Sequence, residues 1–367
     1  MKLKELARIK AGLLCYGVKL DAKAREAGTL RNAYLLDGGF VHAAHFAIDG
    51  VVINTCVSEE FCKQSPYEIS CENNTLILKE NNVFISEIEI LSLPEWCAEG
   101  VDGYVIGDYL RPHSPDCISC CPRLRCMYYS DETQCKFCSL ASRVKSKEFV
   151  DVLPVKTVVQ MIERALKYNP EYEIALSGGT CGTDDKSAKY FSDICKLLTT
   201  NRKNKLNISV ELVPPDKDEY IELLYESGAT AIIMNIEIAN EKQRAEICPG
   251  KATIPLKRYF DAMKKAVAVF GRGKVSSVLI AGIQPEEYIV ELCRKIIPMG
   301  VVPTIIPFKP LDGCQMSGEG TVDADEVLRI ATAVNELLKA ENLEACNQGG
   351  CTKCGGCSLE TVFKVAV

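Results

Sequence analysis

The sequence predicts an α/β fold: a partial (β/α)6 barrel, with a small α+β region before it and a Cys-rich tail after it. Between residues 103 and 340, short apolar runs alternate with amphipathic segments of helix length six times. A strand followed by a helix and another strand makes a parallel βαβ unit, and successive units curl into a barrel. The predicted domains are residues 1–102, 103–340 and 341–367, with a site at the carboxyl ends of the barrel strands.

Each barrel element is predicted from its own pattern. The predicted strands are Tyr104–Tyr109, Tyr172–Leu176, Ile208–Val213, Ala229–Ile238, Val275–Ile283 and Val302–Phe308. The amphipathic segments that follow them are residues 155–168, 187–200, 217–228, 256–271, 286–300 and 324–341. In the first 102 residues, short apolar strands are separated by the hairpin-type pairs Asp49-Gly50 and Asn73-Asn74.

Composition excludes several classes of protein. The chain is 47% hydrophobic and 25% charged, as in a folded globular protein that needs no disulfides. Its net charge of −6 and the lack of a long basic run argue against a nucleic-acid partner. The apolar runs are too short to span a membrane, and the N-terminus has no secretory signal pattern. We therefore expect a reduced, cytoplasmic protein.

Most informative are two tight groups among the 20 cysteines. The first is Cys126-x8-Cys135-x2-Cys138, after the first predicted strand, and the second is Cys346-x4-Cys351-x2-Cys354-x2-Cys357. Thiolates two residues apart converge on one metal ion or cluster. For the first group two interpretations are open. Three cysteines would leave one iron of a [4Fe–4S] cluster open to substrate or cofactor, whereas zinc would take Cys120 or Cys121 as a fourth ligand.

With its neighbours, the first group resembles the radical S-adenosylmethionine (SAM) superfamily. Three ligand cysteines come with an aromatic residue, Phe137, directly before the last one. The usual spacing in that superfamily is C-x3-C-x2-C, so the eight-residue gap here is a variation. The next predicted strand ends in Ser177-Gly178-Gly179-Thr180, which is similar to the superfamily's Gly-Gly turn. That turn binds the methionine amino group, and glycine lets a backbone approach a ligand closely.

Later segments resemble the same superfamily in the same order along the chain. The resemblance implies that Glu211 contacts the ribose, that Glu237 closes the next strand, and that Arg244 meets the methionine carboxylate. It also implies that the strand of Ile280 reads the adenine and that the strand of Phe308 packs against it. We take Cys181, Cys195, Cys248 and Cys293 as buried or incidental thiols. No catalytic side chain is identified.

A narrower resemblance is to the biotin-synthase-related radical enzymes, which contain C-x8-C-x2-C proteins and lie close to two-protein lipoyl synthases of archaea and anaerobes. It rests on residues 249–282 and the tail GCTKCGGCSLE. It implies two [4Fe–4S] clusters and SAM as cofactors. It also implies a 5′-deoxyadenosyl radical that abstracts hydrogen, and insertion of sulfur from the auxiliary cluster into an octanoyl-lysine substrate. The expected partners are a small acyl or peptide substrate, a lipoyl carrier protein, a ferredoxin or flavodoxin, and a second radical SAM protein.

Alternatives stay open for the tail. Cys351, Cys354 and Cys357 form its core, and the fourth ligand is open between Cys346, Ser358 and the Cys117/Cys120/Cys121 group. A closed set of four thiolates would suit an electron relay in an enzyme that modifies a peptide or small metabolite. Three thiolates and a weak ligand would suit release of sulfide. A structural zinc knuckle in a non-catalytic interaction protein is the third interpretation.

Overall fold

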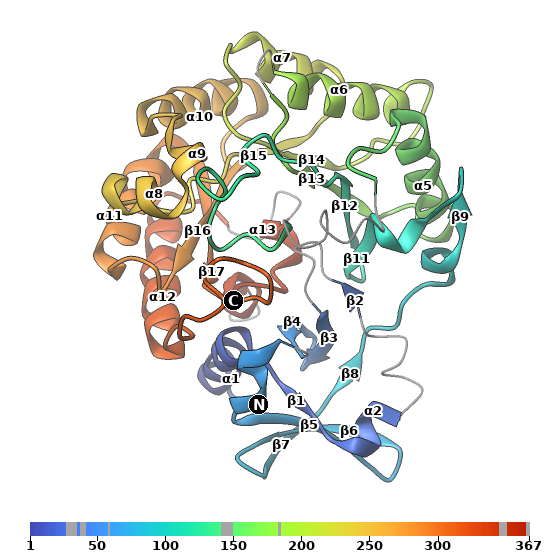
Figure 1. Ribbon diagram of the computed structural model, residues 1–367, viewed down its shortest axis with the longest axis vertical. Coiled ribbons are helices and arrows are strands. Elements are labelled where there is room, and N and C mark those ends of the chain that lie inside the picture. The colour runs from blue at the N-terminus through green and yellow to red at the C-terminus, as the bar shows by residue number, and fades with distance from the viewer. Residues whose placement is uncertain are drawn as a thin grey trace.

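The structure is a computed structural model that describes residues 1–26, 35–36, 42–57, 59–140, 150–182, 185–344 and 351–364. Its main sheet has seven strands in the order β11-β12-β13-β14-β15-β16-β17. All neighbours pair in parallel except β11, which runs antiparallel to β12. In Figure 1 these strands form an arc with the helices outside it. The predicted α/β partial barrel is confirmed.

The strands of this half-barrel are β11 (Leu110–Ser114), β12 (Cys117–Arg123), β13 (Glu173–Gly178), β14 (Ile208–Glu211), β15 (Ala231–Ile233), β16 (Val275–Ala281) and β17 (Val301–Pro307). Its helices are α5 (Val155–Tyr168), α6 (Lys186–Thr199), α7 (Glu219–Glu226), α8 (Glu241–Ile247), α9 (Pro249–Ala252), α10 (Leu256–Phe270), α11 (Glu286–Ile296) and α12 (Ala324–Ala340). All residues of β12 and β16 are buried.

The first barrel strand is not where the sequence predicted it. Tyr104–Tyr109 contains only the two-residue β10 (Tyr104–Val105) and a 3-10 turn, and the first parallel strand is β12. That strand reads CISCCPR, and its cysteines pack as small buried side chains within a strand. The strand is missed from the sequence because closely spaced cysteines also predict metal ligands.

The N-terminal region combines one long helix with short sheets. Its elements are α1 (Leu3–Tyr16), β1 (Lys19–Leu20), α2 (Ala22–Glu26), β2 (Leu35–Leu36), β3 (His42–Ile48), β4 (Val51–Cys56), β5 (Tyr67–Glu72), β6 (Thr75–Glu80), β7 (Val83–Glu87), β8 (Glu89–Ile90) and β9 (Gly100–Val101). Both predicted hairpin turns are confirmed. Asp49-Gly50 joins β3 to β4, Asn73-Asn74 joins β5 to β6, and all four residues have positive φ.

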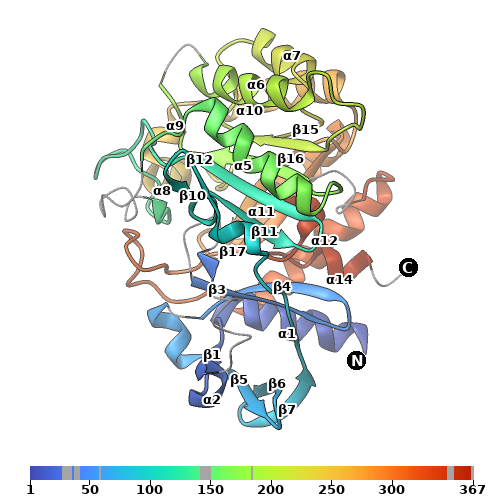
Figure 2. The ribbon, with the colours of Figure 1, turned by 90° about the vertical axis from the view of Figure 1, so that its right-hand side faces the viewer.

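The C-terminal tail joins the two parts of the molecule. Its short helices α13 (Cys351–Cys354) and α14 (Glu360–Lys364) lie inside the arc and next to α1, respectively (Figures 1 and 2). Glu360 accepts a hydrogen bond at 3.2 Å from the backbone N–H of Ile305 in edge strand β17. The Cys354 thiol donates to the His113 carbonyl of the other edge strand, β11, at 3.4 Å. The tail therefore contacts both edges of the half-barrel.

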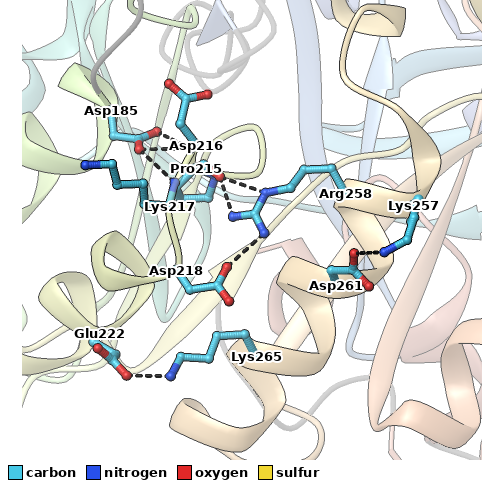
Figure 3. A network of polar contacts seen from close by, with 10 residues as sticks. All are labelled: Asp185, Pro215, Asp216, Lys217, Asp218, Glu222, Lys257, Arg258, Asp261 and Lys265. Carbon is cyan, nitrogen blue, oxygen red and sulfur yellow. Dashed lines mark hydrogen bonds and ion pairs between the residues drawn. The ribbon is translucent and has the colours of Figure 1, made fainter.

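A polar network fixes the loop that follows β14 at the carboxyl edge of the sheet (Figure 3). Arg258 of α10 donates to the Pro215 carbonyl and to the Asp218 carboxylate. The Asp185 carboxylate accepts from the backbone N–H groups of Asp216 and Lys217. Burial raises the pKa of Asp185, and the two backbone donors oppose that rise. The network holds the loop next to the end of the strand that carries Glu211.

None of the described helices combines the length and the apolar character that crossing a bilayer requires.

We predict that Lys10→Met loosens the tail. The Lys10 ammonium is fully buried and donates to the Gly355 carbonyl and the Thr361 hydroxyl, both at 2.7 Å. Losing hydrogen bonds from a charged donor should cost about 2–4 kcal/mol of unfolding free energy. Thermal unfolding should shift down and proteolysis within the tail should accelerate. Lys4→Met, at an exposed position of the same helix, is the control and should change neither; equal behaviour of the two variants would contradict the prediction.

Candidate functional site

A cavity of about 380 Å³ lies inside the arc of strands. Side chains alternate along β12, so that Cys117, Ser119 and Cys121 face the cavity while Ile118 and Cys120 belong to the core. The other strands contribute apolar side chains and a few polar ones. The cavity wall reaches from the loop of the first cysteine group to the cysteines of the tail.

The first cysteine group occupies the loop after β12. The N–H of Cys138 donates to the carbonyl of Cys135 at 3.0 Å, which makes a tight turn. The loop is anchored by Lys136 N–H to the Ile247 carbonyl and by Met127 N–H to the Thr180 carbonyl. Burial raises the pKa of Cys138 to about 12, and the neighbouring Cys135 and Cys126 add to that rise. The three predicted ligands are therefore gathered in one anchored loop.

The Gly-Gly turn at the end of β13 supports this loop from behind. The Gly179 N–H donates to the Arg123 carbonyl at 2.9 Å. A Cβ on Gly179 would lie 2.4 Å from the Arg125 carbonyl oxygen and 2.8 Å from the Cys126 nitrogen. Ser177 and Gly178 line the cavity. Glycine is required because the backbone of this turn touches the backbone that carries the first cysteine.

Three of the predicted cofactor residues meet in a small apolar cluster. Buried Ile280 and Phe308 pack together, and half-buried Phe137 packs against them. All three line the cavity close to the cysteine loop. An aromatic and aliphatic surface of this kind suits a planar base, whose faces are apolar.

Beside this cluster lies a buried polar group. Glu211 accepts a hydrogen bond from the Asn235 amide at 2.9 Å, and burial raises the pKa of the Glu211 carboxyl. Glu237 has a φ of 66°, rare for a residue other than glycine, and forms a 2.9 Å ion pair with Lys251. Burial would lower the pKa of Lys251, but Glu237 and other neighbours raise it well above its usual value. Glu211, Asn235 and Glu237 all line the cavity.

Arg244 lies elsewhere than its predicted role would require. It is 2% exposed, and its guanidinium donates to the carbonyls of Ile254 and Lys251 and lies 5.0 Å from the centre of the Tyr259 ring. It does not appear among the described residues of the cavity wall. The structure therefore uses Arg244 to hold the segment that carries Lys251, and Lys251 is the cation paired with cavity-lining Glu237.

Cys248, predicted from the sequence to be a buried or incidental thiol, is buried and lies against the first cysteine group. Cys135, Glu237 and Cys248 are the only group of at least three Cys, His, Asp or Glu side chains in the described ranges whose ligand atoms all lie within 4.8 Å of one another. A hydrogen bond from Cys248 lowers the pKa of Cys135, and the same bond and burial raise that of Cys248. Cys135 is thus favoured as the thiolate, the form that binds metals.

The spacing of the first group bears on its metal. Thiolates on one tetrahedral zinc ion lie about 3.8 Å apart, from Zn–S bonds of about 2.3 Å. Cys126, Cys135 and Cys138 do not form such a compact group. Each corner iron of a cubane takes one thiolate, so a cubane spreads its ligands more widely. The loop therefore fits a [4Fe–4S] cluster better than a single ion.

The opposite end of the cavity carries the second cysteine group. Cys354, Cys357 and Ser358 line the wall, together with Cys117 and His113. Asn54 lies beneath them, with its amide 3.1 Å from the His113 carbonyl and 3.9 Å from the Cys357 sulfur. Cys346 lies outside the described residues, and Cys351 is described only as the first residue of α13.

Sequence reasoning assigned no role to His113, Asn235 and Lys309 of the wall, nor to Cys248 and Lys251, which lie beside it against Cys135 and Glu237. Asn235 alone had a signal, because it belongs to the Asn-Ile-Glu segment that ends in Glu237. Gly179 and Thr180 lie behind the cavity wall, where their backbones contact the loop that carries Cys126.

The chain is similar to several known proteins. It is 29% identical over 136 residues to bacteriochlorophyllide c C-7(1)-hydroxylase of Chlorobaculum limnaeum, a match covering 36% of this chain and 34% of that protein, about a third of its length. Among solved structures it is similar to the FeFe-hydrogenase maturase HydG from Carboxydothermus hydrogenoformans, with 16% identity, a TM-score of 0.47 and coverage of 61% and 51% of the two chains. It is also similar to a radical SAM methyltransferase from Sphaerobacter thermophilus, with 13% identity, a TM-score of 0.46 and coverage of 80% and 81%.

The family model of the radical SAM superfamily matches residues 129–296. The matched segment begins within the first cysteine loop, contains Cys135 and Cys138, and runs through the Gly-Gly turn to α11. This superfamily uses a [4Fe–4S] cluster and SAM, which agrees with the thiolate loop and the adjoining cavity. Residues 129–296 therefore form a radical SAM domain.

Proposed function

We propose that this radical SAM enzyme inserts sulfur into an unactivated C–H bond of an acyl chain, with an octanoyl-lysine of a lipoyl carrier protein as substrate. The observation that carries the proposal is the single cavity whose wall includes both Cys138 and the tail cysteines Cys354 and Cys357. A substrate held there would lie between a radical source and a second thiolate-bound group. The relation to biotin-synthase-related enzymes stays a prediction.

At one end, Cys126, Cys135 and Cys138 would hold the first [4Fe–4S] cluster. When bound with SAM, this cluster supplies the 5′-deoxyadenosyl radical. The chain's own residues would orient the cofactor: the backbone of Gly178 at the cavity wall would face its amino group, and the apolar cluster around Phe137 would cover its base. Because Glu237 is already paired with Lys251, the site would not present an uncompensated charge to the cofactor.

At the other end, Cys354 and Cys357, with Cys351 and a further ligand, would hold an auxiliary [4Fe–4S] cluster as the sulfur source. Between the ends the wall is largely aliphatic, with Leu140, Ala175, Ile233, Val278 and Ile306. Such a wall suits a saturated chain and excludes water from a radical. A ferredoxin or flavodoxin would supply electrons, and a second radical SAM protein would add the second sulfur.

A second candidate is an oxidative modification without sulfur transfer, in which the auxiliary cluster relays electrons. It is favoured by the similarity to a C-7(1)-hydroxylase, since a hydroxylase oxidises a carbon centre. The cavity accommodates either reaction, and product analysis distinguishes them.

We predict that the anaerobically reconstituted protein, given reductant, SAM and an octanoyl-lysyl peptide, yields 5′-deoxyadenosine together with a thiolated peptide, read by mass spectrometry. Cys354→Ala/Cys357→Ala should keep deoxyadenosine formation and lose the thiolated product, because only the distant end of the cavity is changed. Deoxyadenosine without sulfur transfer in the unmodified protein would reject sulfur insertion on this substrate. Tightly held zinc without iron would reject both enzymatic candidates.

A second prediction concerns the turn behind the first cluster. Gly179→Ala should displace the Cys126 backbone, because the new Cβ would meet it at 2.8 Å. We expect loss of one cluster's iron after reconstitution and at least a tenfold fall in SAM cleavage. Gly182→Ala is the matched control, since a Cβ at Gly182 meets no atom within 4 Å. Full iron content in both variants, measured by iron and sulfide analysis, would contradict the proposed position of the cluster.

A further inference from the structure

We propose that Cys117, from the first parallel strand, is a ligand of the auxiliary cluster together with Cys354 and Cys357. This inference rests on the proposed function, which places that cluster in the tail. From the sequence alone, Cys117, Cys120 and Cys121 were all candidates for the fourth ligand of the tail cluster, and the structure favours Cys117. It also makes the barrel wall, and not the tail alone, part of the second metal site.

Ion pairs place the tail next to Cys117. Lys353, directly before Cys354, contacts Asp116 at 3.6 Å and Glu173 at 2.8 Å. Asp116 is the residue before Cys117, and Glu173 is the residue paired with Cys117 across β12 and β13. Lys353, which precedes the proposed ligand Cys354, therefore binds two residues next to Cys117. One is its chain neighbour Asp116 and the other is its cross-strand partner Glu173.

Contacts from the other side give the same placement. Cys117 pairs with Ser114 in the β11–β12 ladder, one residue beyond His113. The His113 carbonyl accepts from the Cys354 thiol at 3.4 Å and from the Asn54 amide at 3.1 Å, and Asn54 also approaches the Cys357 sulfur. Cys117, Cys354 and Cys357 all line the cavity. The three cysteines thus lie on the same part of the cavity wall.

The two other cysteines of the strand are placed differently. Cys120 is fully buried in the core on the opposite face, where burial raises its pKa and opposes a thiolate. Cys121 faces the cavity, but its thiol points to the Arg123 carbonyl at 3.8 Å, toward the first cysteine loop. Four residues along a strand separate Cys121 from Cys117 by about 13 Å. Of the three, only Cys117 lies at the tail.

The test uses the full chain with Cys126, Cys135 and Cys138 replaced by alanine, so that the auxiliary cluster is the only iron centre expected. After anaerobic reconstitution this parent should hold one [4Fe–4S] cluster per chain. Adding Cys117→Ala should abolish that cluster or leave a [3Fe–4S] form, seen by electron paramagnetic resonance and by iron and sulfide analysis. Adding Cys121→Ala, on the same face of the same strand, should leave the parent's cluster unchanged.

The outcomes separate the two hypotheses. A parent cluster that survives Cys117→Ala with the same spectrum and iron content overturns the role of Cys117 and leaves the auxiliary cluster standing. A parent that binds no iron overturns the auxiliary cluster and this inference with it. Folding is checked by introducing Cys117→Ala into the otherwise unmodified chain, which should keep the circular dichroism spectrum and the thermal unfolding midpoint of the apoprotein and still bind the iron of the first cluster.

Discussion

The C-terminal tail lies between the two edge strands of an open half-barrel, and the cavity with its two cysteine groups depends on this placement. A half-barrel leaves unpaired backbone groups on β11 and β17, and both strands are contacted by the tail, through Cys354 and Glu360. The buried ammonium of Lys10 binds the Gly355 carbonyl, in the middle of the Cys-Gly-Gly-Cys segment. The hydrogen bonds of Lys10, Glu360 and Cys354 therefore hold the tail against the cavity, and they also fix the position of the second cysteine group.

This closure gives the cavity two chemically different ends. At the carboxyl edge, thiols, a strained Glu237 and its Lys251 partner surround the cysteine loop, and backbone anchors hold that loop on several sides. At the tail, sulfur atoms lie among backbone carbonyls and the Asn54 amide. The wall between the two ends is largely aliphatic. A radical formed there would be protected from water by the same wall.

Periodicity and turn chemistry predicted most of the fold. Five of the six barrel strands lie where apolar runs predicted them, and the two hairpin turns follow from residues that tolerate positive φ. The first strand was missed because a group of cysteines predicts either metal ligands or small buried side chains. In β12 they are buried wall and core residues, yet their pattern is that of metal ligands.

The site was predicted less completely, since its residues meet only through tertiary structure. Motifs gave the cysteine loop, the Gly-Gly turn and the Phe137 cluster, because each has local sequence signals. Lys251 and Cys248 could not be found this way, as they reach the site from the segment after α8. Arg244 was expected from the sequence to bind the cofactor, but in the folded segment its guanidinium donates to the backbone carbonyls of Ile254 and Lys251.

The most direct measurement is a crystal structure of the anaerobically prepared protein with SAM. We expect one cubane on Cys126, Cys135 and Cys138, with the cofactor on its free iron and its base beside Phe137, and a second cubane at the tail end of the same cavity. A lone metal ion on those three sulfurs, or a first cubane separated from the cavity by protein, would show that the cavity does not join a radical source to a second cluster.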